Sequence, residues 1–174
     1  MKRLLFGFSI LLISIGFSGC GSNVDTVKDG TMNFNNSTTL GKALDNWQEC
    51  SSSKWSEFET KNGMKIVELT CNGTSFMSQI NKYKDSIASQ NAYNNDIDFE
   101  SSTFVFQFTI NDDNTFDATN AREIITMKSG KTKEQQYQSA SAVLEAYVYT
   151  DKLVHINEYD FVRKAAFTYT PGKK

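Results

Sequence analysis

The sequence predicts an α+β domain in which about three helices pack on antiparallel β-hairpins and one disulfide staples the fold. Apolar residues recur at helical spacing in some segments and alternate on either side of turn signals in others. Hydrophobic residues make up 39% of the 174 residues and aromatic residues 13%, which is typical of a folded domain. The single proline, Pro171, lies near the C-terminus and interrupts none of these elements.

The N-terminal segment has the layout of a secretory signal. Lys2 and Arg3 precede the apolar stretch 4–17, which is shorter than the roughly 20 residues needed to span a bilayer. Phe17-Ser18-Gly19-Cys20 resembles the lipobox of bacterial lipoproteins, with Phe17 where that family usually has an aliphatic residue. The resemblance implies cleavage before Cys20 and acylation of its thiol with diacylglycerol, a palmitate-type anchor. An ordinary secreted protein and an uncleaved membrane anchor are the alternatives.

The expected organisation of the chain follows from this signal. Residues 1–19 form the signal peptide, 20–30 the lipidated cysteine and a short tether, 31–170 a single α+β domain and 171–174 a tail. Lipoproteins kept in the inner membrane of Gram-negative bacteria tend to have aspartate after the cysteine, whereas Gly21 and Ser22 follow here. We therefore expect a lipid-anchored protein of the cell envelope, in the outer membrane and facing the periplasm if the host is Gram-negative.

The first expected helix follows Ser37-Thr38-Thr39, residue types that favour helix N-caps. Its apolar residues lie at positions i, i+3, i+4 and i+7, namely Leu40, Ala43, Leu44 and Trp47. This spacing predicts an amphipathic helix of about three turns that ends near Cys50. Residues 24–31, before it, contain the turn signal Asp29-Gly30 and are expected to form a short strand or an irregular lead-in.

Residues 54–71 predict a β-hairpin, because Asn62-Gly63 separates two alternating segments. Both residues of this dipeptide tolerate positive φ, which favours a two-residue turn. In that register Phe58 faces Val67, and Cys71 faces Lys54.

The hairpin register brings Cys71 close to Cys50, where the first helix ends. With Cys20 lipidated, these two cysteines remain as an even pair in a chain sent to an oxidising compartment. A disulfide between them closes a loop of about twenty residues and contributes roughly 3 kcal/mol through the unfolded state. Two free buried thiols and a metal or redox site are the alternatives, although the only histidine, His155, is distant in sequence.

A second hairpin is expected from the phenylalanine-rich segment that ends at Ile110. Phe104, Phe106 and Phe108 alternate with other residues, which predicts a strand with one aromatic face in the core. Residues 111–115 then turn the chain, and 116–127 return as the second strand. Further helices are expected over 75–91 and 134–149, a charged loop over 128–133, and a strand within 153–169.

Several residues could take part in chemistry, and each has a commoner structural role. His155 could complete a catalytic triad, but it lies in an apolar alternating stretch. The turn 111–114 with Asp117 is rich in hard oxygens and could bind calcium, yet Asn and Asp also favour turns. Asp96, Asp98 and Glu100 alternate along an extended stretch, so their side chains share one face. They could supply the acid pair of a glycosidase, or they could lie on the solvated face of a sheet. We expect no enzyme, no cofactor and no metal.

The charge of the chain bears on its partners. The formal net charge is −2, and no Lys/Arg cluster is present, so neither nucleic acid nor an anionic lipid surface is an expected partner. A helix followed by an aromatic-rich hairpin resembles the small domains of BamE-like outer-membrane lipoproteins, over about 37–71. We expect a non-catalytic domain that binds an envelope protein partner or supports envelope structure. The alternative is a carrier of a small hydrophobic ligand or lipid, with a pocket behind the phenylalanine stripe.

Overall fold

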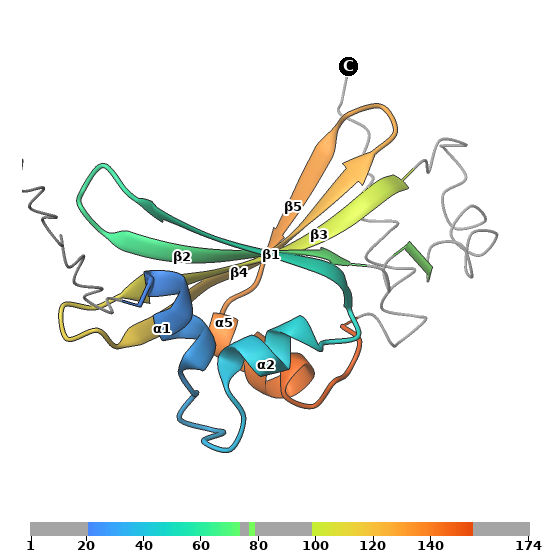
Figure 1. The fold of residues 1–174 in the computed structure, drawn as a ribbon. Helices are drawn as coiled ribbons and strands as arrows, with labels where there is room; N and C mark the ends of the chain where they lie inside the picture. The colour runs from blue at the N-terminus through green and yellow to red at the C-terminus, as the bar shows by residue number, and fades with distance from the viewer. Residues whose placement is uncertain (1–20, 74–76, 79–98, 155–174) are drawn as a thin grey trace, which may run out of the picture.

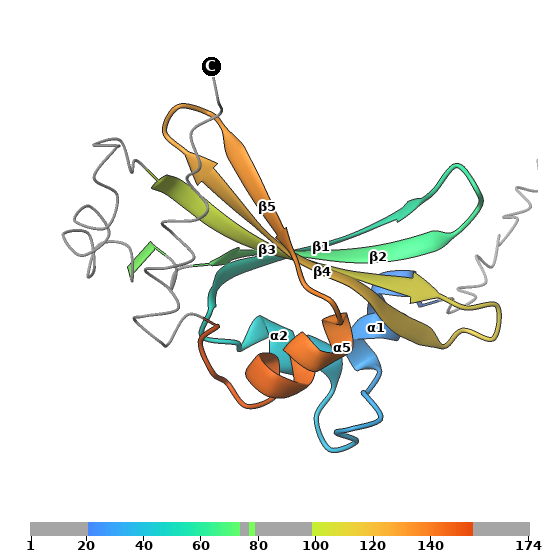
Figure 2. The same cartoon turned by 180° about the vertical axis from the view of Figure 1, so that it is seen from behind.

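A computed structural model describes residues 21–73, 77–78 and 99–154. Within these residues, five antiparallel strands form one sheet in the order β1-β2-β3-β4-β5, so strands adjacent in sequence are also adjacent in space. Three short helical segments lie together on one face of this curved sheet (Figures 1 and 2). The strands are β1 Cys50–Glu59, β2 Lys65–Gly73, β3 Phe99–Ile110, β4 Phe116–Met127 and β5 Thr132–Gln136. The helical segments are α1 Asn23–Asp29, α2 Leu40–Asp45, and α5 Ala140–Val143 with the π-helical turn η1 Leu144–Val148.

The core lies between the sheet and the helices. Phe104, Phe106 and Phe108 are fully buried, which confirms the predicted aromatic stripe of β3. The indole ring of Trp47 lies 5.4 Å from the ring of Phe104 and 6.0 Å from that of Phe106. The helices contribute further buried side chains to this cluster, among them Val27, Leu40, Leu44, Val143 and Leu144.

All three described hairpins have the same type of turn. The first residue i of the turn is Thr60, Asn111 or Met127. In each turn, the backbone N–H of residue i donates to the carbonyl of residue i+4, and the N–H of residue i+3 donates to the carbonyl of residue i. The fourth residue of each turn has positive φ: 80° at Gly63, 63° at Asn114 and 78° at Gly130. These are three-residue loops, in which one residue takes the left-handed conformation.

This turn corrects the expected register of the first hairpin. Phe58 pairs with Ile66 rather than Val67, and Cys71 pairs with Ser53 rather than Lys54. The expected two-residue turn is wrong because only Gly63 has positive φ, so the loop contains one more residue. A slip of one residue moves a side chain to the other face of a sheet, which is why Phe58 is exposed.

The first helix was not expected. Residues 24–31 are predicted to be a strand or irregular, yet Asn23–Asp29 form α1. Ser22 and Asp25 make a capping box, in which each side chain accepts a hydrogen bond from the other residue's backbone N–H. The capping box and the burial of Val27 in the core explain why this short helix forms here.

The later helices differ from expectation mainly in length. Thr39 caps α2 as predicted, but α2 ends at Asp45, before Trp47. The helix expected over 134–149 is wrong in its first part, because Thr132–Gln136 form β5. The Gly130 turn folds this segment back onto β4, and the helix begins only after the Ser139 cap. The expected helix over 75–91 and strand within 153–169 fall largely outside the described residues.

The structure confirms the disulfide between Cys50 and Cys71. Their Cα atoms are 5.3 Å apart, and 21 positions separate them in sequence. Cys50 is the first residue of β1, beside an irregularity in the ladder between Cys50 and Ser52. The bond therefore fixes the point where the helical layer passes into the sheet. No helix in the described part of the chain is long and apolar enough to cross a membrane.

Removal of this disulfide is expected to destabilise the domain by about 3 kcal/mol, because the unfolded chain regains the entropy of a twenty-residue loop. The measurement is the free energy of unfolding in urea for wild type and for the double variant Cys50→Ala, Cys71→Ala. A reducing agent should lower the stability of wild type by a similar amount and leave the double variant unchanged. Equal stability of the two proteins under oxidising conditions would contradict this account.

Candidate functional site

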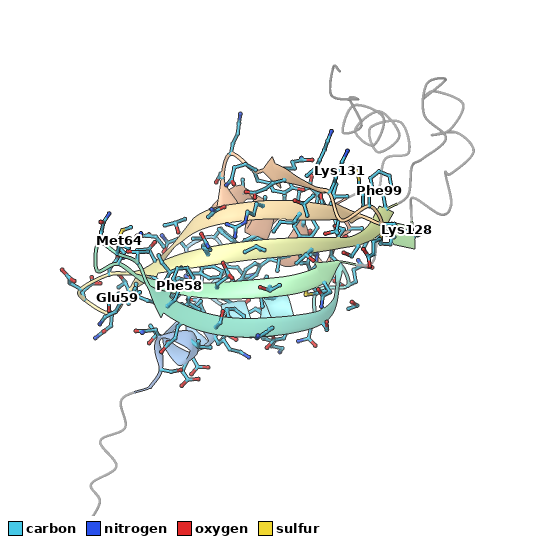
Figure 3. The ribbon with its side chains drawn as sticks, turned by 90° about the horizontal axis from the view of Figure 1, so that it is seen from above. Phe58, Glu59, Met64, Phe99, Lys128 and Lys131 are labelled. Carbon is cyan, nitrogen blue, oxygen red and sulfur yellow. A yellow bond between two sulfur atoms is a disulfide. The ribbon has the colours of Figure 1, made fainter. Side chains whose placement is uncertain are left out.

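The sheet has a second face, and none of the described helices lies on it. Figure 3 looks down onto this open face, which consists of the side chains that alternate with the core residues of each strand. Its middle carries a row of polar side chains from four neighbouring strands: Glu68 of β2, Gln107 of β3, Asn120 of β4 and Gln136 of β5.

Hydrogen bonds join this row into a continuous polar network across the sheet. The Gln136 amide donates to the Asn120 amide oxygen at 2.7 Å, and Asn120 donates to Gln107 at 3.3 Å. Gln107 donates in turn to a carboxylate oxygen of Glu68 at 2.7 Å. All three links use side chains, so they hold the face in a defined pattern of donors and acceptors beyond the backbone ladder.

Arg122 adds a positive charge beside the polar row. Its guanidinium nitrogens lie 3.7 Å from carboxylate oxygens of both Glu68 and Glu134. Such partly exposed ion pairs contribute little to stability, so their value lies more in arranging charge than in holding the fold. The open face therefore presents interspersed charges of both signs.

Apolar side chains flank the network on the same face. Ile66 and Val105 are 7% and 4% exposed, and Phe58 lies at the margin of the sheet with 44% of its surface exposed. The two apolar side chains next to the network are therefore buried, and Phe58 is the large apolar side chain that is exposed on this face among the described residues.

A separate polar cluster lies on the covered side of the sheet. Glu123 is fully buried, and the Ser102 hydroxyl donates to one of its carboxylate oxygens at 2.6 Å. The Tyr137 hydroxyl donates to the other at 3.4 Å. Burial raises the pKa of Tyr137 far above its ordinary value, and the negative charge of Glu123 raises it further. The phenol therefore stays protonated and serves as a donor to the buried carboxylate.

The connection between α2 and β1 holds the chain that follows η1. The Trp47 indole N–H donates to the carbonyl of Lys152 at 2.9 Å, and a carboxylate oxygen of the buried Glu49 accepts from the Val154 N–H at 3.1 Å. Glu49 thus has a structural role here, because it binds backbone that would otherwise lose hydrogen bonds on burial.

The residues of the turn 111–115, for which calcium binding was the alternative to a hairpin turn, form hydrogen bonds within the turn. The Asp113 carboxylate accepts from both the N–H and the hydroxyl of Thr115, at 3.0 and 2.6 Å. These hydrogen bonds lower the pKa of Asp113. The Asn111 amide donates to Thr115 and Asp117. Among the described residues, no group of three or more His, Cys, Asp or Glu side chains is placed to bind a metal ion.

The remaining residues that the sequence analysis considered are placed as follows. Cys50 and Cys71 form the disulfide, and Glu100 is an exposed residue near the start of β3. Cys20, Asp96, Asp98 and His155 lie outside the described residues.

Two hollows lie on the described part of the surface. One, of about 350 Å³, lies between the β1–β2 and β3–β4 turns and is lined by polar residues with Met64 and Ile110. The other, of about 310 Å³, lies between α2 and η1 and includes Tyr149 and Val148. Neither groups side chains in an arrangement typical of catalysis.

The polar network was not predicted from the sequence. Glu68 and Gln107 each lie between two apolar residues, and Asn120 precedes Ala121, which indicates that they lie opposite the core. Their alignment in one row depends on the register of three strand pairs and on a bulge in β4. The sequence contains no direct signal for the register or for the bulge.

Comparison with known proteins leaves the chain without an assigned family. No protein-family description matches it, no curated protein resembles it significantly, and no solved structure does.

The partly buried phenol of Tyr137 predicts a dependence of stability on pH. Because the folded protein retains the Tyr137 proton while the unfolded chain releases it above about pH 10, the unfolding free energy should fall as the pH rises past 10. The contribution of this group is about 1.4 kcal/mol per pH unit. Urea unfolding of wild type and Tyr137→Phe should show a steeper alkaline decline for wild type. Parallel declines would show that burial of this phenol contributes nothing to the pH dependence.

Proposed function

We propose that this protein is a lipid-anchored envelope lipoprotein whose non-catalytic domain binds a protein partner through the open face of its sheet. The observation that supports this most directly is the hydrogen-bonded polar network on that face, opposite the helices. A network of this kind presents a fixed pattern of donors and acceptors, which a partner of complementary shape can recognise.

In this proposal, α1, α2 and α5 serve to cover the face of the sheet that does not bind the partner. Their buried side chains meet those of β2 and β3 in one core. The helical layer therefore makes the sheet rigid and leaves the other face available for binding, in the way that binding sites on strands are held by a packed scaffold.

The charge on the open face favours a protein partner over nucleic acid. Arg122 lies beside Glu68 and Glu134, so the described residues of this face form no continuous positive surface that could contact phosphates. The pI of about 5.4 agrees with this.

The packing of the core favours partner binding over the alternative of a lipid or small-ligand carrier. A pocket behind the phenylalanine stripe would need space next to Phe104 and Phe106. The ring of Trp47 occupies that space and contacts both.

The anchoring part of the proposal rests on the sequence Phe17-Ser18-Gly19-Cys20. Acylated Cys20 would hold the domain on the membrane, in the periplasm against the outer membrane if the host is Gram-negative. The signal peptide 1–19 would be removed before this.

Site-specific photocrosslinking in cells tests the proposal. A photoreactive phenylalanine analogue replaces Thr70, in the open face, or Lys42, an exposed residue of α2 on the covered side. We expect a discrete adduct from position 70 and none from position 42. Arg122→Glu should reduce the adduct several-fold, because it reverses the charge next to Glu68 and Glu134.

The membrane anchor is tested in the same cells. Intact mass should show acyl chains on the mature wild-type protein, and Cys20→Ala should lose both these chains and most of the adduct. Adducts of equal yield from both positions, or none from position 70, would refute partner binding through the open face. An unmodified wild-type N-terminus would refute the anchor.

A further inference from the structure

The start of α1 is fixed to one end of the sheet. The backbone N–H of Val24 donates to a carboxylate oxygen of Glu57 at 3.3 Å, and Glu57 lies two residues before the end of β1. At its other end, Gly30 packs against the ring of Phe116, the first residue of β4. Thus α1 crosses the sheet next to the turns of the β1–β2 and β3–β4 hairpins (Figure 1).

Very little chain separates this end of the sheet from the expected lipid. Ser22 is the N-cap of α1, held by its capping box with Asp25, and only Gly21 lies between Ser22 and Cys20. Two residues of extended chain span at most about 7 Å. An acyl chain on Cys20 would therefore leave the domain beside the hairpin end, and the tether is too short to let the domain turn over.

The tip of the β1–β2 hairpin has the side chains of a membrane-contacting surface. Among the described residues, the large hydrophobic side chains that are exposed are Phe58, at 44%, and Met64, at 49%. Lys61 and Lys65 flank Met64 and are also exposed. Figure 3 shows Phe58 and Met64 at one end of the sheet, and Lys128 and Lys131 at the other.

We infer that this hairpin end faces the lipid bilayer and that Met64 and Phe58 contact its interface. The inference rests on the proposed acylation of Cys20. Apolar side chains of a peripheral protein enter about 5–10 Å into the boundary between headgroups and acyl chains. The ammonium groups of Lys61 and Lys65 can remain at headgroup level while their methylene stems lie along the apolar residues.

The neighbouring β3–β4 turn limits how deeply the tip can enter. Asp112 and Asp113 are exposed there, and carboxylates lose favourable hydration when they leave water. The contact is therefore shallow and orients a domain that the lipid already holds. In this orientation the strands run away from the membrane. The open face of the sheet does not contact the bilayer and remains accessible to a partner.

Quenching of an introduced tryptophan tests this orientation. The full-length protein, processed and acylated in cells, is purified as wild type, Met64→Trp or Lys131→Trp and reconstituted into phosphatidylcholine–phosphatidylglycerol vesicles. Lipids brominated on the acyl chains quench tryptophans near the interface. The signal of interest is the tryptophan emission of each variant in excess of wild type. For Met64→Trp we expect this excess emission to fall by about half, given the shallow depth of a peripheral contact. The excess emission of Lys131→Trp should be unchanged.

Each result has a definite meaning. Both positions are exposed, so either variant is expected to fold, and the intrinsic Trp47 and Trp55 are common to all three proteins. Quenching of Lys131→Trp equal to or greater than that of Met64→Trp would overturn the inference, as would no quenching of Met64→Trp in vesicle-bound, acylated protein. Intact mass identifies the separate case in which Cys20 carries no lipid, which refutes the anchor itself.

Discussion

The contact between Trp47 and the phenylalanine stripe of β3 is the interaction on which the rest of the structure depends. Trp47 follows α2, and its ring meets Phe104 and Phe106 at 5.4 and 6.0 Å. Its indole N–H also donates to the carbonyl of Lys152 and so holds the chain after η1. Large aromatic side chains bury more apolar area than any others, so this cluster determines which face of the sheet the helices cover.

Because side chains alternate along each strand, the choice of the covered face also determines which residues lie on the open face. Residues that neighbour the stripe in sequence, such as Gln107 and Val105, must point to the opposite side. The polar network and its flanking apolar residues are therefore a consequence of the same packing. Only a short link joins Cys20 to α1, and the Val24 N–H of α1 donates a hydrogen bond to Glu57 of β1. In the proposed lipoprotein, these connections would orient the sheet relative to the membrane. The proposed binding face and the proposed membrane contact thus occupy different parts of one rigid sheet.

The sequence alone was sufficient for features that depend on local chemistry. The alternation of Phe104, Phe106 and Phe108 predicts their burial, and Thr39 is an N-cap as its position before Leu40 indicates. The cysteine count predicts the disulfide. The register of the first hairpin could not be predicted, because Asn62-Gly63 fits either a two- or a three-residue loop.

The remaining differences arise from contacts between distant segments. β5 forms because the Gly130 turn brings it onto β4, although its own residues are polar and fit a helix equally well. The capping box of Ser22 and Asp25 is visible in the sequence, but α1 is stable only because Val27 enters a core built from later residues. The open-face network requires the register of β2, β3 and β4 together. Such information is distributed over the whole fold and has no local signal.

The most direct test of this account compares the stability of two variants on the two faces of the sheet. Phe106→Ala removes a ring from the cluster with Trp47 and is expected to lower the unfolding free energy by about 3–5 kcal/mol. Ile124→Ala, on the half-buried open face of β4, should lower it by about 1 kcal/mol. The measurement is urea unfolding of both variants and wild type. Equal losses for the two variants would contradict the claim that the main core lies on the helix-covered face of the sheet.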